Sequence, residues 1–176
     1  MNLLGIGTDA KTSKGTSLNV LTGILYLAPS NESQVINTCP KASKGCRLSC
    51  LFSAGRGAFN SVKQARIGKT LHFWRDRDQF MLDLVDDVAK LIRKATKLGM
   101  TPAVRLNGTS DIAWEQILLN GKNIMQIFPG VTFYDYTKRI DRVREYAAGN
   151  LPANYSLTFS KSENNDDEVA EAVRLG

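Results

Sequence analysis

The sequence predicts an α/β fold in which helical crossovers join the strands of a partial, barrel-like parallel sheet. Short runs rich in β-branched and aromatic residues alternate with longer segments of helical periodicity, the pattern of parallel βα units. The first such run, residues 19–28, is almost continuously apolar, as expected of a strand buried on both faces. The chain has 176 residues, 43% of them hydrophobic. We therefore expect a single domain spanning 1–176, with a substantial core.

The expected elements follow an irregular, polar N-terminal segment over residues 1–18. Helical periodicity begins near Ser61 and restarts at an N-cap formed by Asp76 or Asp78. Gly99 then ends the second helix. The remaining expected elements are strands over 101–107, 131–136 and 155–160, and helices over 113–120, 138–148 and 166–175.

A polar segment follows each of the four expected strands. The carboxyl ends of parallel strands lie at one edge of the sheet, where ligand sites form, so we expect these segments to meet. Four strands cannot close a barrel, and the chain stops directly after its last helix, so we also expect a partial barrel or a truncated fragment. The polar segments are the cysteine loop over 30–60, then 107–111, 136–139 and 160–163.

All three cysteines lie within twelve residues, as Cys39, Cys46 and Cys50 in the spacing C-x6-C-x3-C. Thiolates gathered in one loop are typical ligands of a shared metal centre. Three ligands leave one position open on an iron–sulfur cluster, which is the favoured interpretation and would suit an enzyme. The alternatives are zinc with a fourth ligand, for which His72 is the only imidazole, and three buried structural thiols.

A three-cysteine loop after the first strand of a parallel barrel resembles the radical S-adenosylmethionine enzymes. Their usual spacing is C-x3-C-x2-C, and this loop departs from it at both intervals. The resemblance implies that a glycine-containing segment after the second strand binds S-adenosylmethionine. Gly108, Thr109 and Ser110 stand at that place, and Ser160 opens a similar polar segment after the fourth strand.

Charged and polar side chains near the strand ends are the candidate catalytic and substrate-binding groups. Arg105 lies inside an apolar strand, where a charge needs a partner, and Asp135 in the next strand would supply one. Asn107 and Asp111 follow the strand of Arg105; their alternative role is a turn and a helix N-cap. Lys138 and Arg139 are placed to bind a carboxylate or phosphate, although exposed cations are common at the start of a helix.

Positive charge is concentrated around the cysteine loop. Residues 1–75 carry ten Lys or Arg and two acids, whereas residues 76–176 carry thirteen and fifteen. Such a region attracts nucleic acid or a phosphorylated substrate, or offsets an anionic thiolate-ligated cluster, so we expect a small-molecule or nucleotide-like substrate, with nucleic acid as a further partner. The rival hypothesis is therefore a zinc-stabilised nucleic-acid-binding protein, favoured by Phe52, Phe59 and Trp74 among the cations. The simplest alternative is a solvated basic face.

The sequence also bears on the compartment. No apolar run approaches the roughly 20 residues that span a bilayer, and the N-terminus lacks the pattern of a secretory signal. We expect a cytoplasmic protein without a membrane partner.

Five stretches of the chain resemble the phage gene-product-88 family, a group of bacteriophage and prophage proteins without an assigned function. The resemblance covers almost the whole chain. It implies a phage origin, and hence the cytoplasm of an infected host cell, but no particular chemistry. The resemblance also implies that relatives continue through further strands, in keeping with the expected truncated fragment. The stretches are residues 21–29, 39–57, 105–111, 133–138 and 155–160.

Overall fold

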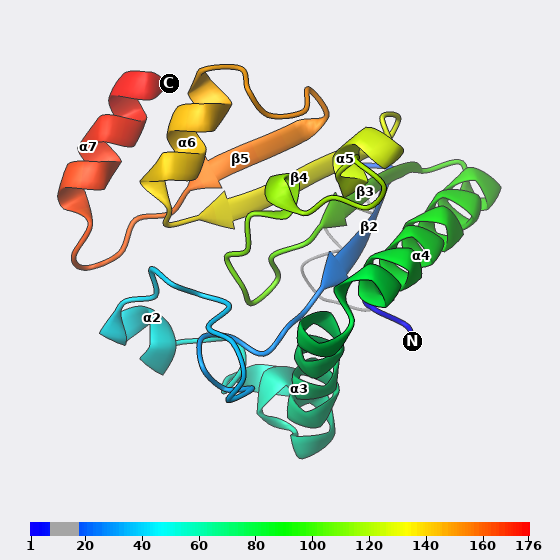
Figure 1. Cartoon of the computed structure of the whole chain (residues 1–176), viewed down its shortest axis with the longest axis horizontal. Coiled ribbons are helices and arrows are strands. Elements are labelled where there is room, and N and C mark those ends of the chain that lie inside the picture. Colours follow the sequence, from blue (N-terminus) through cyan, green and yellow to red (C-terminus); the bar gives the residue numbers. More distant parts are fainter. Residues whose placement is uncertain (8–17) are drawn as a thin grey trace.

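The computed structural model, which describes residues 1–7 and 18–176, contains an open five-stranded sheet (Figure 1). The strands lie in chain order, β2 to β5 run parallel, and β1 pairs with β2 in the antiparallel sense at the edge. The predicted α/β class, with a mostly parallel sheet and helical crossovers, is confirmed. The strands are β1 (Leu4–Ile6), β2 (Val20–Leu25), β3 (Thr101–Arg105), β4 (Thr132–Thr137) and β5 (Tyr155–Phe159).

Helices lie in each crossover between consecutive parallel strands, and one further helix follows β5. Asp76 caps the longest one by accepting a hydrogen bond from the Gln79 N–H at 3.0 Å, and Gly99 ends it in the left-handed conformation. Both boundaries match the sequence prediction. The helices are α2 (Lys44–Leu48), α3 (Asn60–Arg75), α4 (Arg77–Leu98), α5 (Ile124–Ile127), α6 (Ile140–Ala147) and α7 (Asp166–Leu175).

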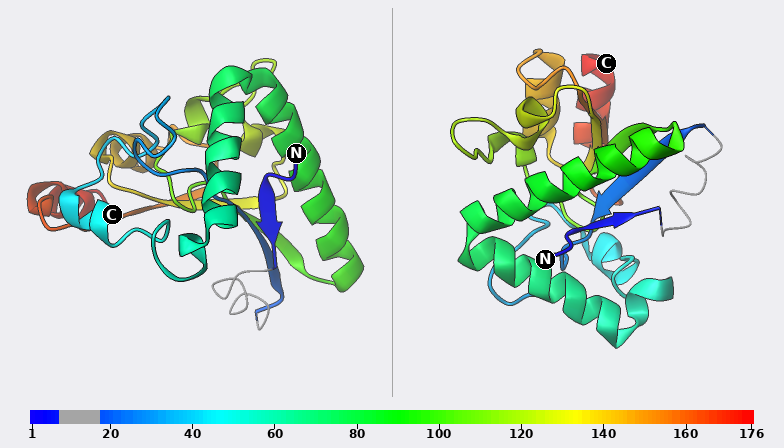
Figure 2. Two further views of the ribbon diagram at one scale, coloured as in Figure 1. Left: turned by 90° about the horizontal axis from the view of Figure 1, so that it is seen from below. Right: turned by 90° about the vertical axis from the view of Figure 1, so that its right-hand side faces the viewer.

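Helix α4 forms the core with strands β2 and β3. Its apolar stripe, which includes Leu84 and Leu91, is fully buried. Gly23 lies beneath this helix, and a Cβ there would come within 3.1 Å of Leu91. Each fully buried leucine contributes about 1.5–3 kcal/mol through removal from water, so this helix–sheet contact stabilises the first half of the fold. Figure 2 shows α3 and α4 joined at one end and splayed apart in a V, on the opposite side of the molecule from α6 and α7.

Strands β4 and β5 have one buried face and one exposed face. Along β4, Phe133, Asp135 and Thr137 are buried, whereas Tyr136 between them is 44% exposed. Tyr155 and Leu157 of β5 continue the buried face. Helix α6 packs against β5 and against α7. The polar alternation of β4 thus places its even-numbered residues on the open side of the sheet.

Three local predictions were wrong. The segment 1–18 contains strand β1, which is held by tertiary contacts because the Asp87 carboxylate accepts from the Leu3 and Leu4 N–H groups at 2.6 and 3.1 Å. Residues 8–17 of that prediction lie outside the described residues. The cysteine loop is not wholly irregular, since it contains α2. The helix expected over 113–120 is reduced to one 3-10 turn, Trp114–Gln116.

The missing helix has a physical explanation. The chain is already extended at Ile117, and a tight turn closed by an antiparallel bridge between Leu119 and Lys122 follows, so the helix ends after one turn. Asn123 then starts α5 through a capping box with Gln126. The chain turns there because local capping outweighs weak helical periodicity.

Within residues 1–7 and 18–176, every helix is too short or too polar to cross a bilayer.

Candidate functional site

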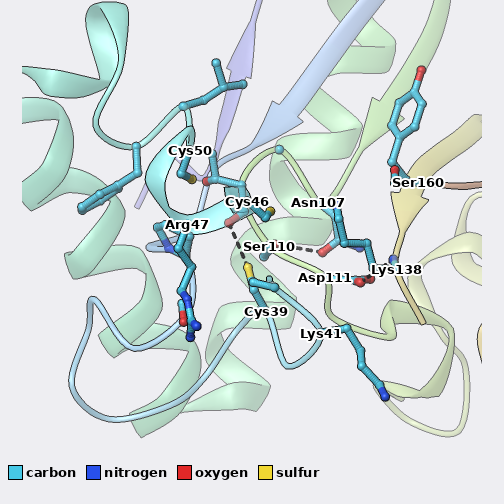
Figure 3. Close-up of a pocket in the computed structure, with 18 of the residues that line it drawn as sticks. Cys39, Lys41, Cys46, Arg47, Cys50, Asn107, Ser110, Asp111, Lys138 and Ser160 are labelled. Atoms are coloured by element: carbon cyan, nitrogen blue, oxygen red, sulfur yellow. Dashed lines mark hydrogen bonds between the residues drawn. The ribbon is translucent and has the colours of Figure 1, made fainter. Parts of the chain in front are cut away.

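A pocket of about 1040 Å³ lies at the carboxyl edge of the parallel strands (Figure 3). Its walls come from the segments that follow β2, β3, β4 and β5, the convergence expected from the topology. Asp135 is the one singled-out site residue absent from the lining; it is buried below the pocket. The lining residues that the sequence singled out are Cys39, Cys46, Cys50, Arg105, Asn107, Gly108, Thr109, Ser110, Asp111, Lys138 and Ser160.

The short helix α2 carries Cys46 into the pocket. Ser43 caps this helix by accepting from the Cys46 N–H at 3.1 Å. The carboxylate of Glu163, from the loop after β5, accepts from the Ser43 hydroxyl and the Gly45 N–H, both at 2.7 Å. A Cβ on Gly45 would lie 2.8 Å from Glu163 Oε1, so glycine permits this approach. Glu163 therefore docks the cysteine helix onto the sheet edge.

The three cysteines are free, half-buried thiols. Cys39 Sγ donates to the Thr109 carbonyl at 3.5 Å. Burial raises the pKa of the Cys39 thiol, which favours its protonated form in the absence of a cation. In the part of the chain that the structure describes, no three Cys, His, Asp or Glu side chains are arranged to hold a metal ion. The metal centre expected from the cysteine spacing stays a prediction.

Asn107 organises the loop after β3. Its Oδ1 atom accepts from Ser110 Oγ at 2.8 Å, the Ile112 N–H at 3.0 Å and Trp114 Nε1 at 3.1 Å. Its Nδ2 atom donates to the Ile112 carbonyl at 2.9 Å and to Asp135 Oδ2 at 3.2 Å. These bonds use the donors and acceptor of the amide within the protein. The geometry therefore favours the turn role for Asn107 over contact with a ligand.

Asp111 joins this loop to the end of β4. Its Oδ1 atom accepts from Thr137 Oγ1 at 2.7 Å and from Arg142 Nη1 at 2.9 Å. Its Oδ2 atom accepts from the Lys138 N–H at 2.9 Å. Asp111 is thus engaged by neighbours on both oxygens and stabilises one wall of the pocket.

Glycine and threonine bring the loops after β2 and β3 together. A Cβ on Gly108 would lie 2.7 Å from the Leu25 carbonyl oxygen, so a side chain there would force the loops apart. Thr109 Oγ1 donates to the Leu27 carbonyl. Ser160, which also lines the pocket, donates its N–H to the Thr137 carbonyl at 2.7 Å.

A buried ionic network that the sequence did not indicate lies beneath the pocket. Arg142, 1% exposed, donates to both oxygens of Glu115 at 2.8 Å and to the Tyr155 hydroxyl at 2.5 Å. The Tyr155 hydroxyl in turn donates to Asp135 Oδ2 at 3.1 Å. No periodicity marks Arg142 as buried, because its partners lie on other elements.

Asp135 belongs to the same network. Its Oδ1 atom accepts from the Asn107 N–H at 2.7 Å. Burial raises the pKa of Asp135 to about 7, although the Asn107 N–H and the charges of Arg142 and Arg105 lower it. The carboxyl therefore titrates near neutrality below the floor of the pocket.

The expected ion pair between Arg105 and Asp135 is wrong. Val104 pairs with Phe133, so Arg105 falls on the face of β4 that carries Tyr136, and Asp135 falls on the opposite face. Arg105 Nε instead donates to the Asn107 carbonyl at 3.3 Å, and its guanidinium lies 4.8 Å from the Tyr136 ring centroid.

His72 is remote from the cysteines. It is on α3, where its Nε2 lies 3.1 Å from Asp83 Oδ2, and it does not line the pocket. Any zinc site on these cysteines would therefore take its fourth ligand from another residue.

Fold and pocket together define an α/β protein with a thiol-containing polar pocket at the carboxyl edge of an open, mostly parallel sheet. The chain matches the family model described as Gene product 88 over residues 3–175, and it belongs to that family. The resemblance to the phage gene-product-88 family is thereby confirmed. No curated protein and no solved structure matches the chain significantly. The layout of a radical S-adenosylmethionine enzyme gains no support from these comparisons and stays a prediction.

Proposed function

We propose that the pocket binds a small, nucleotide-like substrate and that Cys39, Cys46 and Cys50 hold an iron–sulfur cluster beside it for redox or radical chemistry. One observation carries the proposal: all three thiols of the chain line the same pocket as the polar strand ends. Lys41 and Arg47 enter the pocket from the cysteine loop and would offset the negative charge of a thiolate-ligated cluster.

The donor set suits this group. Three thiolates are appropriate ligands for an iron–sulfur cluster and leave one iron open to a small molecule. Because the described sulfurs do not form a ready-made metal site, binding requires residues 39–50 to close around the cluster. A bound cluster would supply electron transfer. The chain itself contributes Glu163, which orients the helix of Cys46.

A more specific version of the proposal is that the pocket binds S-adenosylmethionine. Gly108, Thr109 and Ser110 would contribute the shape and backbone groups of their loop, because Thr109 and Ser110 already use their hydroxyls to bond Leu27 and Asn107. Ser160 would contribute from the loop after β5. A titration with S-adenosylmethionine in the presence and absence of iron tests this form separately.

Anaerobic purification followed by iron, sulfide and zinc analysis tests the proposed function. We expect iron and sulfide in comparable amounts and a broad visible absorption. The control variant Ser53→Ala should keep the same iron and sulfide content, because the Ser53 hydroxyl lines the pocket but donates only to the Cys50 carbonyl at 3.1 Å. Colourless protein with stoichiometric zinc would sink the iron–sulfur proposal. Protein without any metal would contradict both the iron–sulfur proposal and the zinc proposal.

A zinc-stabilised nucleic-acid-binding protein is the second candidate. Its support is the exposure of Phe59 and Trp74, at 62% and 51%, in the basic first half of the chain. Exposed aromatic rings among cations suit single-stranded nucleic acid. Titration with DNA and RNA should then show affinity that falls steeply with added salt. Absence of binding at low salt would remove this candidate.

A further inference from the structure

We propose that Arg105 and Lys138 form a phosphate-binding subsite inside the pocket, so that the ligand is a nucleoside phosphate. This inference rests on the proposed function only in taking the pocket as the substrate site. It needs neither the cluster nor any particular reaction.

Arg105 is held in place before any ligand arrives. Its Nε atom donates to the Asn107 carbonyl at 3.3 Å, and its guanidinium lies over the ring of Tyr136 at 4.8 Å. Among the described residues, no acceptor is hydrogen-bonded to its terminal Nη atoms. A guanidinium fixed through Nε and stacked on an aromatic ring presents a planar pair of donors, the geometry that binds phosphate in a bidentate manner.

Lys138 supplies the second cation. Its backbone N–H is anchored by Asp111 Oδ2 at 2.9 Å, at the end of β4, and the residue lines the pocket. The neighbouring Arg139 differs, because its guanidinium pairs with Asp141 at 2.6 Å and it does not line the pocket. The two consecutive cations therefore differ: Arg139 closes a surface ion pair, whereas Lys138 lines the pocket. Hydrogen bonds to its carboxylate, together with the charge of Lys138, lower the pKa of Glu163.

The charge of the pocket favours a ligand with more than one negative charge. Four described lining residues are cationic and two are acidic, and one of those acids, Asp111, shares the guanidinium of Arg142 with the buried Glu115. A carboxylate brings a single charge, whereas a phosphate monoester brings nearly two at neutral pH. The cationic lining residues are Lys41, Arg47, Arg105 and Lys138.

The size and aromatic content of the pocket favour a nucleoside rather than phosphate alone. Its volume of about 1040 Å³ is at the upper end of typical small-molecule sites. Tyr134 also lines it, and an aromatic ring of this kind stacks on nucleobases. Because stacking tolerates every base, the phosphate carries the recognition.

The test is calorimetric titration of the protein, as purified anaerobically, with ribonucleoside monophosphates and the matching nucleosides. The monophosphates should bind at least about tenfold more tightly. Arg105→Gln and Lys138→Met should each weaken monophosphate binding by about 10- to 100-fold, since each removes a charge-assisted contact. Nucleoside binding should not change.

Two variants serve as matched controls. Arg77 also stacks on an aromatic ring, 4.7 Å from the centroid of Phe73, but does not line the pocket, so Arg77→Gln should bind like the wild type. Arg139→Gln should do the same. Arg105→Lys keeps the charge without the bidentate geometry and should bind monophosphate with intermediate affinity.

The proposed subsite would be overturned if monophosphates and nucleosides bind with equal affinity or if neither binds. It would also be overturned if Arg105→Gln and Lys138→Met both bind monophosphate as tightly as the wild type. Circular dichroism establishes that each variant is folded, and Arg105→Lys replaces Arg105→Gln if the latter is not. Iron analysis of the same samples separates the two proposals. Phosphate-dependent binding by iron-free protein supports the subsite and contradicts the cluster, whereas iron-loaded protein without phosphate preference does the reverse.

Discussion

The two walls of the pocket differ in how firmly the chain holds them. The strand wall, residues 105–111 and 134–138, rests on a buried network in which every described buried polar side-chain atom has a partner. The cysteine wall, residues 39–53, contains a five-residue helix without a buried residue. Its side-chain attachments to the strand ends are those of Glu163 and Cys39. The strand wall is therefore preorganised, whereas the cysteine wall is the part of the pocket that is able to close around a ligand.

The largest expected effect is on the strand wall. Arg142→Met should lower the free energy of unfolding by about 3–5 kcal/mol, because it leaves Glu115 and Asp111 as unpaired buried charges. Urea denaturation measures this loss. Arg144→Met is the matched control: Arg144 lies in the same helix as Arg142 and pairs with Glu171 of α7, but its side chain is 55% exposed, so its removal should change stability little. Similar effects of the two substitutions would contradict a buried supporting network.

The second prediction concerns pH and Asp135. Its folded-state pKa, about 7, lies above the ordinary 3.8. Between these values the folded state binds more protons than the unfolded state, so this group makes stability fall as pH rises from about 4 to about 7. Asp135→Asn removes that contribution. As pH rises across this window, the free energy of unfolding of the variant should therefore increase relative to that of the wild type, by up to about 1.4 kcal/mol per pH unit.

Urea denaturation of both proteins from acidic to neutral pH tests this slope. Asp141→Asn is the contrasting variant, because its pairing with Arg139 lowers the pKa of Asp141. The carboxylate of Asp141 contributes stability above its unfolded pKa, and this contribution is lost as pH falls through the folded pKa. Because Asp141→Asn lacks this contribution, the variant should become less stable relative to the wild type as pH rises through that range. Parallel pH profiles for wild type and Asp135→Asn would contradict the assignment.

The smallest effect on global stability is expected on the cysteine wall. Glu163→Gln weakens the contacts that dock α2, and the Gly45→Ala Cβ would crowd the same carboxylate. Both variants should show faster hydrogen exchange in residues 43–50 and unchanged exchange in residues 105–111. Glu171→Gln, at an exposed ion pair, is the control. Faster exchange in both walls would mean that they are not independent.

Much of the fold was predictable because its signals are local. The buried strand β2, the cap at Asp76 and the stop at Gly99 depend on neighbouring residues. The meeting of the strand ends follows from parallel topology. Strand β1 was missed because three residues show no periodicity and its anchor, Asp87, is more than eighty residues away.

The site was predictable only as a set of positions. The residues singled out do line one pocket, with the exception of Asp135, but the sequence did not show which of them are occupied by internal bonds. Asn107 and Asp111 are engaged by partners that only the fold brings close. Arg142 and Glu115 are 27 residues apart, so the sequence around either residue does not indicate that the two form a buried ion pair.

We propose that the three thiols act together on one cluster, and substitution of each cysteine in turn is the sharpest test. Iron and sulfide should be measured after anaerobic purification of wild type, Cys39→Ser, Cys46→Ser and Cys50→Ser. The account predicts comparable iron and sulfide in the wild type, and loss of most of both in each variant while the far-ultraviolet circular dichroism is retained. Wild-type protein without iron, or iron content indifferent to all three substitutions, would contradict it.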